Sequence, residues 1–280
     1  MTRKIALLSD VHGNSTALEA VLADAESKQV TDYWFLGDLL MPGTGRRNIL
    51  ERLDQLPISL QVRGNWEDSL WRALHGKLDL SRPSHLYLTR LCHFILEEIR
   101  PEEIDRMQEL PLQVLTEVEG LKIAVSHHLP DKNWGRELIH IGEQADFDRL
   151  FEGNEAAIAI YGHIHQQFLR YGTKGQLVIN PGSIGQPFFL DATLRQDLRA
   201  QYAIIEIDET GLKDVDLCRV AYDVEQELEI ARELQLPYYE IYEESIVNGI
   251  HHTHNHDLLR EISEREDYFA SVKEFLRDPL

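Results

Sequence analysis

Short apolar runs recur along the chain, and each ends in a turn of glycine and polar residues. The first run, residues 4–8, is apolar apart from Lys4 and predicts a buried strand. The turn after it carries Asp10, His12 and Gly13. Side chains alternate between the two faces of a strand, so Asp10 and His12 can reach one point only where the strand has become a loop. Gly13 permits such a turn, because glycine adopts conformations that other residues avoid.

The same pattern predicts further strands and helices. The expected strands are residues 4–8, 33–36, 58–62, 112–118, 121–125, 156–160, 167–171, 176–180, 202–207 and 215–220. Helices are expected after the capping residues Asn14 and Asp223, over 46–56 and 238–248, near 143–152, in two or three segments of 66–110, and at the end to about residue 277. A hairpin is expected between the strands 167–171 and 176–180.

The order of these elements indicates an α/β protein. The first three strands alternate with helices, which favours a mainly parallel sheet, and the last two favour an antiparallel pair. At least two layers of strands are needed, which predicts a sandwich of sheets flanked by helices. Residues 66–110 interrupt the alternation and are interpreted as a helical insertion, which either lines the substrate cleft or serves only as scaffold. The expected domain is residues 1–220, with a helical C-terminal extension, 221–280, packed on it.

The amino-acid composition limits which partners the protein is expected to bind and in which compartment it is expected to lie. The chain has 280 residues, with 28 Lys and Arg against 48 Asp and Glu, so its formal net charge is −20. Such a charge repels nucleic-acid backbones and anionic membranes, and neither is an expected partner. The chain has two cysteines, no membrane-length apolar run and no signal-peptide pattern, which predicts a cytoplasmic protein. Apolar positions in the tail favour a homodimer.

Residues that can bind metal ions follow five of the predicted strands. They are Asp10 and His12, then Asp38, Asn65, His127, and finally His163 and His165. Ligands gather at the carboxyl ends of parallel strands, so a shared site would require this arrangement. Oxygen and imidazole donors together suit a borderline metal ion.

These motifs (D-x-H, G-D, G-N, a later H and G-H-x-H) resemble the signature of calcineurin-like metallophosphoesterases. The turn at residues 180–183 is similar to one in the small bacterial phosphodiesterase branch, which includes diadenosine tetraphosphate hydrolase-like enzymes. The resemblance spans about residues 4–207 and implies the family's four-layer α/β/β/α sandwich. It further implies two metal ions (Mn, Fe or Zn), the first held by Asp10, His12 and His165, the second by Asn65, His127 and His163, and both by Asp38.

The reaction that the resemblance implies is in-line attack on phosphorus by a hydroxide bridging the two metals. Many relatives follow G-N with a histidine that assists the leaving oxygen, whereas Trp66 stands here and cannot donate a titrating proton. We therefore expect hydrolysis of phosphodiester or phosphoanhydride bonds in nucleotides such as dinucleoside polyphosphates. His128 is a candidate acid, and the candidate substrate contacts are Asn65, Arg63, Trp66 and Arg136.

Two alternatives stay open: a phosphomonoesterase, including a protein phosphatase, and a non-catalytic metal-binding interaction protein. Other residues are expected to lie outside the chemistry. Ser183 lacks the context of a serine-hydrolase nucleophile and is expected to be a turn hydroxyl. The histidines between His251 and His256 could bind a transition metal, but a solvated loop outside the active site is expected. The histidines of the insertion are expected on the surface or in the core, and they are His75, His85 and His93.

Overall fold

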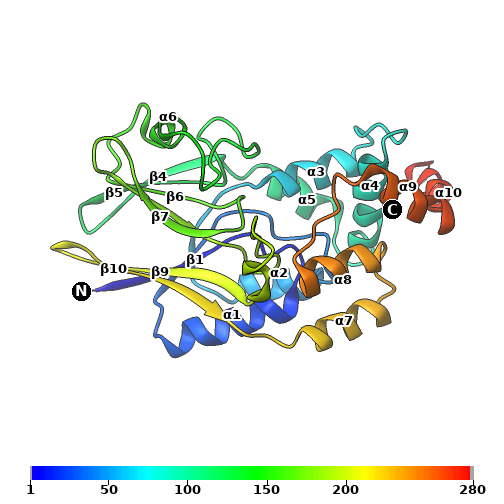
Figure 1. Ribbon diagram of the computed structural model, residues 1–280, viewed down its shortest axis with the longest axis horizontal. Helices are drawn as coiled ribbons and strands as arrows, with labels where there is room; N and C mark the ends of the chain where they lie inside the picture. Colours follow the sequence, from blue (N-terminus) through cyan, green and yellow to red (C-terminus); the bar gives the residue numbers. More distant parts are fainter. Residues whose placement is uncertain (1, 278–280) are drawn as a thin grey trace.

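Two five-stranded sheets pack face to face in the computed structural model, which describes residues 2–277 (Figure 1). The first sheet, in the order β10-β9-β1-β2-β3, contains β1 (Arg3–Leu8), β2 (Asp32–Phe35), β3 (Ile58–Gln61), β9 (Ala200–Asp208) and β10 (Gly211–Val220). The second, in the order β4-β5-β6-β8-β7, contains β4 (Gln113–Val118), β5 (Leu121–Ser126), β6 (Ile158–Tyr161), β7 (Gln167–Tyr171) and β8 (Leu177–Pro181). Strands β1 to β3 are parallel and β9 and β10 antiparallel, so both predictions are confirmed.

The core between the sheets is built from alternate residues of each strand. In β1, Ile5 and Leu7 pack against the second sheet, which contributes Ile158 of β6. Ala6 and Leu8 face the other way and pack under helices. Both faces of β1 are covered, which is why the strand is a continuous apolar run without polar alternation.

Helices cover the outer faces of both sheets, which gives the predicted α/β/β/α order of layers (Figure 1). On the first sheet lie α1 (Ser15–Ser27) and α2 (Arg47–Asp54). On the second lie α6 (Gln144–Asp148) and the 3-10 turn Arg149–Phe151. Asn14 caps α1 as predicted, because its Oδ1 accepts a hydrogen bond from the backbone N of Ala17 at 3.0 Å.

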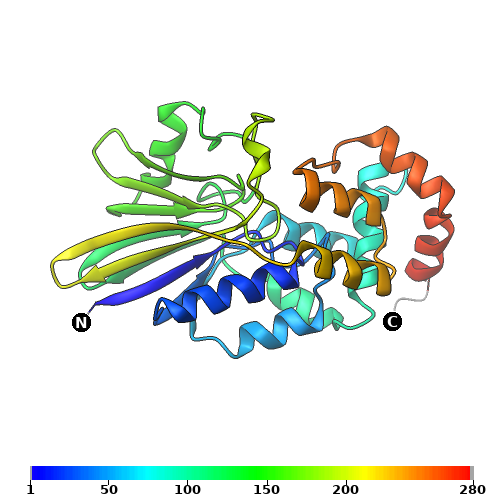
Figure 2. The same ribbon diagram turned by 60° about the horizontal axis from the view of Figure 1, so that its bottom comes forward.

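The remaining helices gather at one end of the molecule (Figure 2). Three lie between β3 and β4, namely α3 (Asn65–Leu74), α4 (Pro83–Ile95) and α5 (Pro101–Gln108). Four follow β10, namely α7 (Val224–Glu233), α8 (Tyr239–Asn248), α9 (His256–Arg265) and α10 (Tyr268–Arg277). Rings join the two sets: His93 stacks on Phe275 with centroids 4.5 Å apart, and the Tyr238 ring lies 4.8 Å from that of Tyr87.

Two helix predictions need correction. The single helix expected to about residue 277 is two helices, because Asp267 has a left-handed backbone (φ 51°) that ends α9 and redirects the chain. The helix expected near 143–152 is one short α-helix followed by a 3-10 turn. No helix within residues 2–277 is both long enough and apolar enough to span a membrane.

Candidate metal centre

The loops that follow β1, β2, β5 and β6 converge beside the start of α3. These loops carry six of the seven residues that the sequence analysis proposed as metal ligands, namely Asp10, His12, Asp38, His127, His163 and His165, and the seventh, Asn65, is the first residue of α3. The structure therefore brings together side chains that are up to 155 residues apart, from Asp10 to His165 (165 − 10).

Five of these residues have a left-handed backbone, with φ of 55° at Asp10, 51° at His12, 59° at Asp38, 64° at His163 and 58° at His165. Non-glycine residues rarely adopt this region, and each costs roughly 1–3 kcal/mol. The sequence placed the turn after β1 at Gly13, which is left-handed as well. However, Asp10 and His12 make the turn themselves, and this lets their side chains approach each other. Strain of this kind clusters at functional sites.

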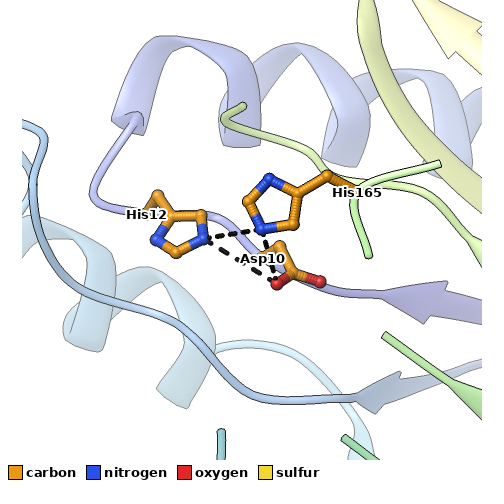
Figure 3. A group of neighbouring side chains, drawn as sticks. All are labelled: Asp10, His12 and His165. Carbon is orange, nitrogen blue, oxygen red and sulfur yellow. Dashed lines mark hydrogen bonds and ion pairs between the residues drawn. The ribbon is translucent and has the colours of Figure 1, made fainter. Parts of the chain in front are cut away.

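The first donor group joins Asp10, His12 and His165 (Figure 3). His165 Nε2 lies 3.0 Å from Asp10 Oδ1 and 3.1 Å from His12 Nε2. The other ring nitrogens face backbone carbonyls: His12 Nδ1 lies 2.9 Å from Met41 O, and His165 Nδ1 lies 2.6 Å from Gln186 O. Each carbonyl accepts the ring N–H, so both Nε2 atoms can present a lone pair to a cation.

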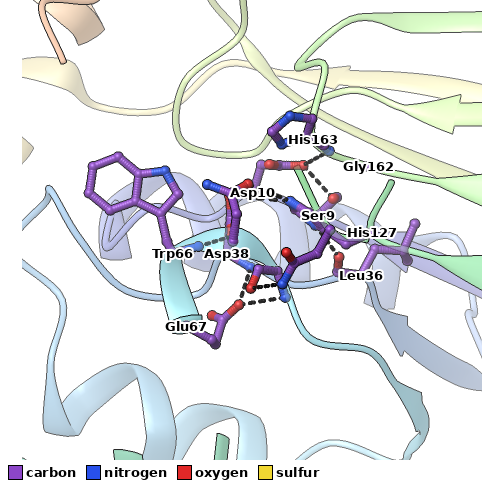
Figure 4. A network of polar contacts seen from close by, with 12 residues as sticks. Ser9, Asp10, Leu36, Asp38, Trp66, Glu67, His127, Gly162 and His163 are labelled. Carbon is purple, nitrogen blue, oxygen red and sulfur yellow. Dashed lines mark hydrogen bonds and ion pairs between the residues drawn. The ribbon is translucent and has the colours of Figure 1, made fainter. Parts of the chain in front are cut away.

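The second donor group joins Asp38, His127 and His163 (Figure 4). His127 Nε2 lies 3.3 Å from Asp38 Oδ2 and 3.2 Å from Asn65 Oδ1. Its Nδ1 faces Leu36 O at 2.6 Å, which leaves Nε2 available in the same way. His163 Nε2 lies 3.0 Å from a carbonyl oxygen in the loop after β5.

Asp38 lies between the two groups. Its Oδ2 is 3.3 Å from His127 Nε2 and 3.8 Å from His12 Nε2. Its Oδ1 accepts a hydrogen bond from the backbone N–H of Trp66 at 2.8 Å, which fixes the carboxylate (Figure 4). One oxygen thus faces both groups, as a ligand shared by two closely spaced metal ions must.

The side chains of the two donor groups are better suited to binding cations than to hydrogen-bonding with one another. Asp10 Oδ1 is buried and has no hydrogen-bond partner within residues 2–277, although His165 Nε2 is near. In the absence of metal, protons have to fill the gap. Against the effect of burial, the Asp38 carboxylate raises the pKa of His127 to about 10, and Asp10 raises the pKa of His165. A divalent ion in each group would replace these protons and pair the orphaned oxygen.

Glu67 is a buried carboxylate that the sequence analysis did not assign. Its two oxygens accept backbone hydrogen bonds from Asp38 at 2.9 Å, Leu39 at 2.8 Å and Gly64 at 2.8 Å (Figure 4). Burial, and then the nearby Asp38 carboxylate, raise the pKa of Glu67 to about 7. Glu67 therefore ties the end of β2 to the start of α3. Its position three residues after the N-cap Gly64, as in a capping box, was the available signal.

The residues proposed for substrate contact occupy different environments. Arg136 is exposed and lines a cavity of about 910 Å³ beside Asn65. Arg63 instead forms an ion pair with Asp68 at 2.9 Å. The half-buried Trp66 ring packs edge-on to another ring, that of His12, with centroids 5.3 Å apart.

The other candidate side chains are placed as follows. His128 is buried, its Nε2 lies 3.1 Å from Glu137, and burial lowers its pKa to about 4. Ser183 is a turn hydroxyl, as expected: it donates to the backbone oxygen of Asp10 at 2.8 Å. The insertion histidines belong to neither donor group, and they are His75, His85 and His93.

His251 departs from the expected solvated loop. Its ring lies 6.1 Å from that of His165 and 5.7 Å from that of Phe188, measured between centroids. Its Nε2 is shielded from solvent and has no hydrogen-bond partner in the described part of the chain. Burial, and then His165, lower the pKa of His251 to about 3. His254 is exposed and lines the same cavity as Arg136. Neither placement was predictable from the sequence pattern.

Known proteins share this architecture. A model of the calcineurin-like phosphoesterase superfamily domain matches residues 4–210. The uncharacterised protein MJ0912 of Methanocaldococcus jannaschii is 27% identical over 255 residues, which cover 83% of this chain and 93% of that protein. Two crystal structures have the same fold: a metallophosphoesterase from Sphaerobacter thermophilus (24% identity, TM-score 0.65) and the hypothetical protein PH1004 from Pyrococcus horikoshii (17%, 0.69). Each comparison covers 89% of this chain and 99% of the other.

Proposed function

Because this chain belongs to the calcineurin-like phosphoesterase superfamily, we propose that it hydrolyses phosphodiester or phosphoanhydride bonds of nucleotides, such as dinucleoside polyphosphates, in a metal-dependent reaction. The observation that carries the proposal is the position of Asp38 Oδ2, 3.3 Å from His127 and 3.8 Å from His12. In this proposal Asp38 is shared by two metal ions, one held by Asp10, His12 and His165, the other by Asn65, His127 and His163. Bound metal ions would activate water as the nucleophile and offset negative charge on the phosphate oxygens.

The residues around the centre position the reactants. Backbone carbonyls hold the rings of His12, His127 and His165 with Nε2 facing inward. The Trp66 indole cannot protonate a leaving oxygen, and the lowered pKa of His128 leaves that ring neutral. A leaving group that departs as a stable anion, such as a phosphate, is therefore favoured over an alkoxide, which needs a proton.

The test removes bound metal with a chelator and then adds manganese, iron or zinc separately. Two metal ions per chain are expected, together with turnover of bis(p-nitrophenyl) phosphate and diadenosine tetraphosphate that exceeds turnover of p-nitrophenyl phosphate. The variant Asp38→Asn is the control for the centre and is expected to lose metal and activity together. Faster hydrolysis of monoesters would favour a phosphomonoesterase. Metal binding without turnover of any of these phosphates would favour a non-catalytic protein.

A further inference from the structure

The cavity beside the second donor group carries positive charge that the protein itself does not neutralise. It measures about 910 Å³, within the usual range for small-molecule sites, and part of its wall is formed by His163 of the donor group and by Asn65, which lies beside His127. Arg72 of α3 and Arg136 also line it, and neither guanidinium has a hydrogen bond or ion pair within residues 2–277. In a chain of net charge −20, two unpaired guanidiniums in one cavity mark a site for an anion.

The acidic side chains of this cavity are already paired. Asp68 forms an ion pair with Arg63 at 2.9 Å and accepts a hydrogen bond from Asn133 at 2.9 Å. Glu137 is paired with Lys132 and lies 3.1 Å from His128 Nε2. The negative charge lining the cavity is thus offset by these partners, and the charge of the two arginines remains for a ligand.

An aromatic surface completes the cavity. Trp134 is 61% exposed, unusual for so large an apolar side chain, and Lys132 Nζ lies 4.7 Å from its ring centroid. Trp71 also lines the cavity, but it is only partly exposed and its Nε1 donates a hydrogen bond to Asp105 at 2.9 Å. Trp134 is therefore the ring available to stack on a planar group such as a nucleobase.

The loop that carries Trp134 and Arg136 is anchored to the donor groups. The buried Asn133 donates to the backbone oxygen of Gly64 at 2.7 Å, next to Asn65. The backbone of Gly135, between Trp134 and Arg136, lies against the ring of His163, with its oxygen 3.0 Å from Nε2. The cavity residues thus keep a fixed position relative to the place where a phosphate would be cut.

We propose that this cavity binds the leaving part of a nucleoside polyphosphate, with a second phosphate on Arg72 and Arg136 and the base on Trp134. This rests on the proposed function and narrows the substrate to phosphoanhydrides that carry a base. In the reaction, the oxygen of water forms a bond to the phosphorus held at the donor groups, and the bond from that phosphorus to the bridging oxygen breaks. The bridging oxygen keeps the electron pair and leaves as phosphate, while the proton of water passes to solvent.

The kinetic test compares three substrates on the metal-supplied protein: diadenosine tetraphosphate, inorganic tripolyphosphate and bis(p-nitrophenyl) phosphate. Arg72→Ala and Arg136→Ala should each lower kcat/KM for the two polyphosphates about tenfold or more, mainly through KM, since each removes a charge-assisted contact. Trp134→Ala should lower it for the adenine-containing substrate and leave it unchanged for inorganic tripolyphosphate. In the two arginine variants the diester, which lacks a second phosphate, should change less than about twofold. Arg82→Ala is the matched control, because Arg82 is an exposed arginine just before α4 that does not line the cavity.

A binding test separates this proposal from the proposed function. Titration calorimetry is done with ADP and with pyrophosphate, on protein with and without manganese. The arginine variants should bind both ligands more weakly, and Trp134→Ala should bind only ADP more weakly. Weakened binding in a protein that turns over no substrate would leave the cavity assigned and reject the catalytic function. Two results would overturn the cavity proposal in a protein that turns over the diester. One is an equal loss of kcat/KM on all three substrates in the arginine variants, and the other is unchanged ADP binding in every variant.

Discussion

Replacement of Glu67 by glutamine tests whether this carboxylate sets the position of Asp38. One oxygen, Oε2, accepts from the backbone N–H groups of Asp38 and Gly64, and Oε1 accepts from that of Leu39. Glutamine has one acceptor oxygen, so its NH2 group must face at least one of these N–H groups. A buried donor left unpaired costs about 1–3 kcal/mol. Because the mismatch falls at the end of β2, it should also displace Asp38 and weaken metal binding, by about tenfold if it acts like other residues that orient metal ligands.

Urea unfolding, measured with and without manganese, gives both quantities. Loss of about 2 kcal/mol is expected in the metal-free variant, and the extra stability that metal confers should fall by about 1.4 kcal/mol for a tenfold weaker affinity. Glu103→Gln is the matched control, because Glu103 likewise accepts from the N-terminal backbone of its own helix, at Arg100 N (2.9 Å), but belongs to neither donor group. It should lower stability and leave the metal-dependent increment unchanged. An unchanged increment in Glu67→Gln would refute the reasoning.

Three further predictions concern stability, each measured by urea unfolding. Gly37→Ala should lower the free energy of unfolding by more than about 3 kcal/mol, because φ is +97° and a Cβ would lie 2.5 Å from the backbone nitrogen of Gly64. The control Gly153→Ala, where φ is +71° and no atom lies within 4 Å of the added Cβ, should lower it by about 1 kcal/mol. His251→Phe keeps an aromatic ring and removes the unpartnered nitrogen, so stability should be equal or higher; a clear loss would mean that the nitrogen has a partner. Arg47 holds the pKa of Glu103 well below its usual range, so the folded carboxylate stays ionised at a pH where the unfolded chain already takes up a proton. The loss of stability caused by Glu103→Gln should therefore become smaller as the pH falls below about 4.5. The same loss at every pH from 7 to 3 would contradict this.

The sequence was sufficient to predict the strands and to predict that seven side chains following them would lie close together, and physical reasons explain both. Strands buried on both faces, such as β1, leave continuous apolar runs, and parallel strands deliver the residues after them to one edge. Glu67 and His251 were missed because their roles depend on contacts across the fold, to Asp38 and His165 respectively. The cavity was only partly anticipated, through Arg136, since lone surface arginines leave no periodic signal.

The backbone of the donor loops shows how the fold sustains its strained conformations. Beyond β1 and β2 the two chains remain hydrogen-bonded: Asp10 N donates to Gly37 O at 3.0 Å, His12 N to Asp38 O at 3.0 Å, and Gly13 N to Leu39 O at 2.9 Å. Each hydrogen bond stabilises the fold by roughly 0.5–1.5 kcal/mol, which offsets part of the roughly 1–3 kcal/mol that a left-handed residue costs. The rest must come from the packing of side chains around these loops. Metal affinity should therefore depend on residues such as Glu67, whose hydrogen bonds hold these loops together.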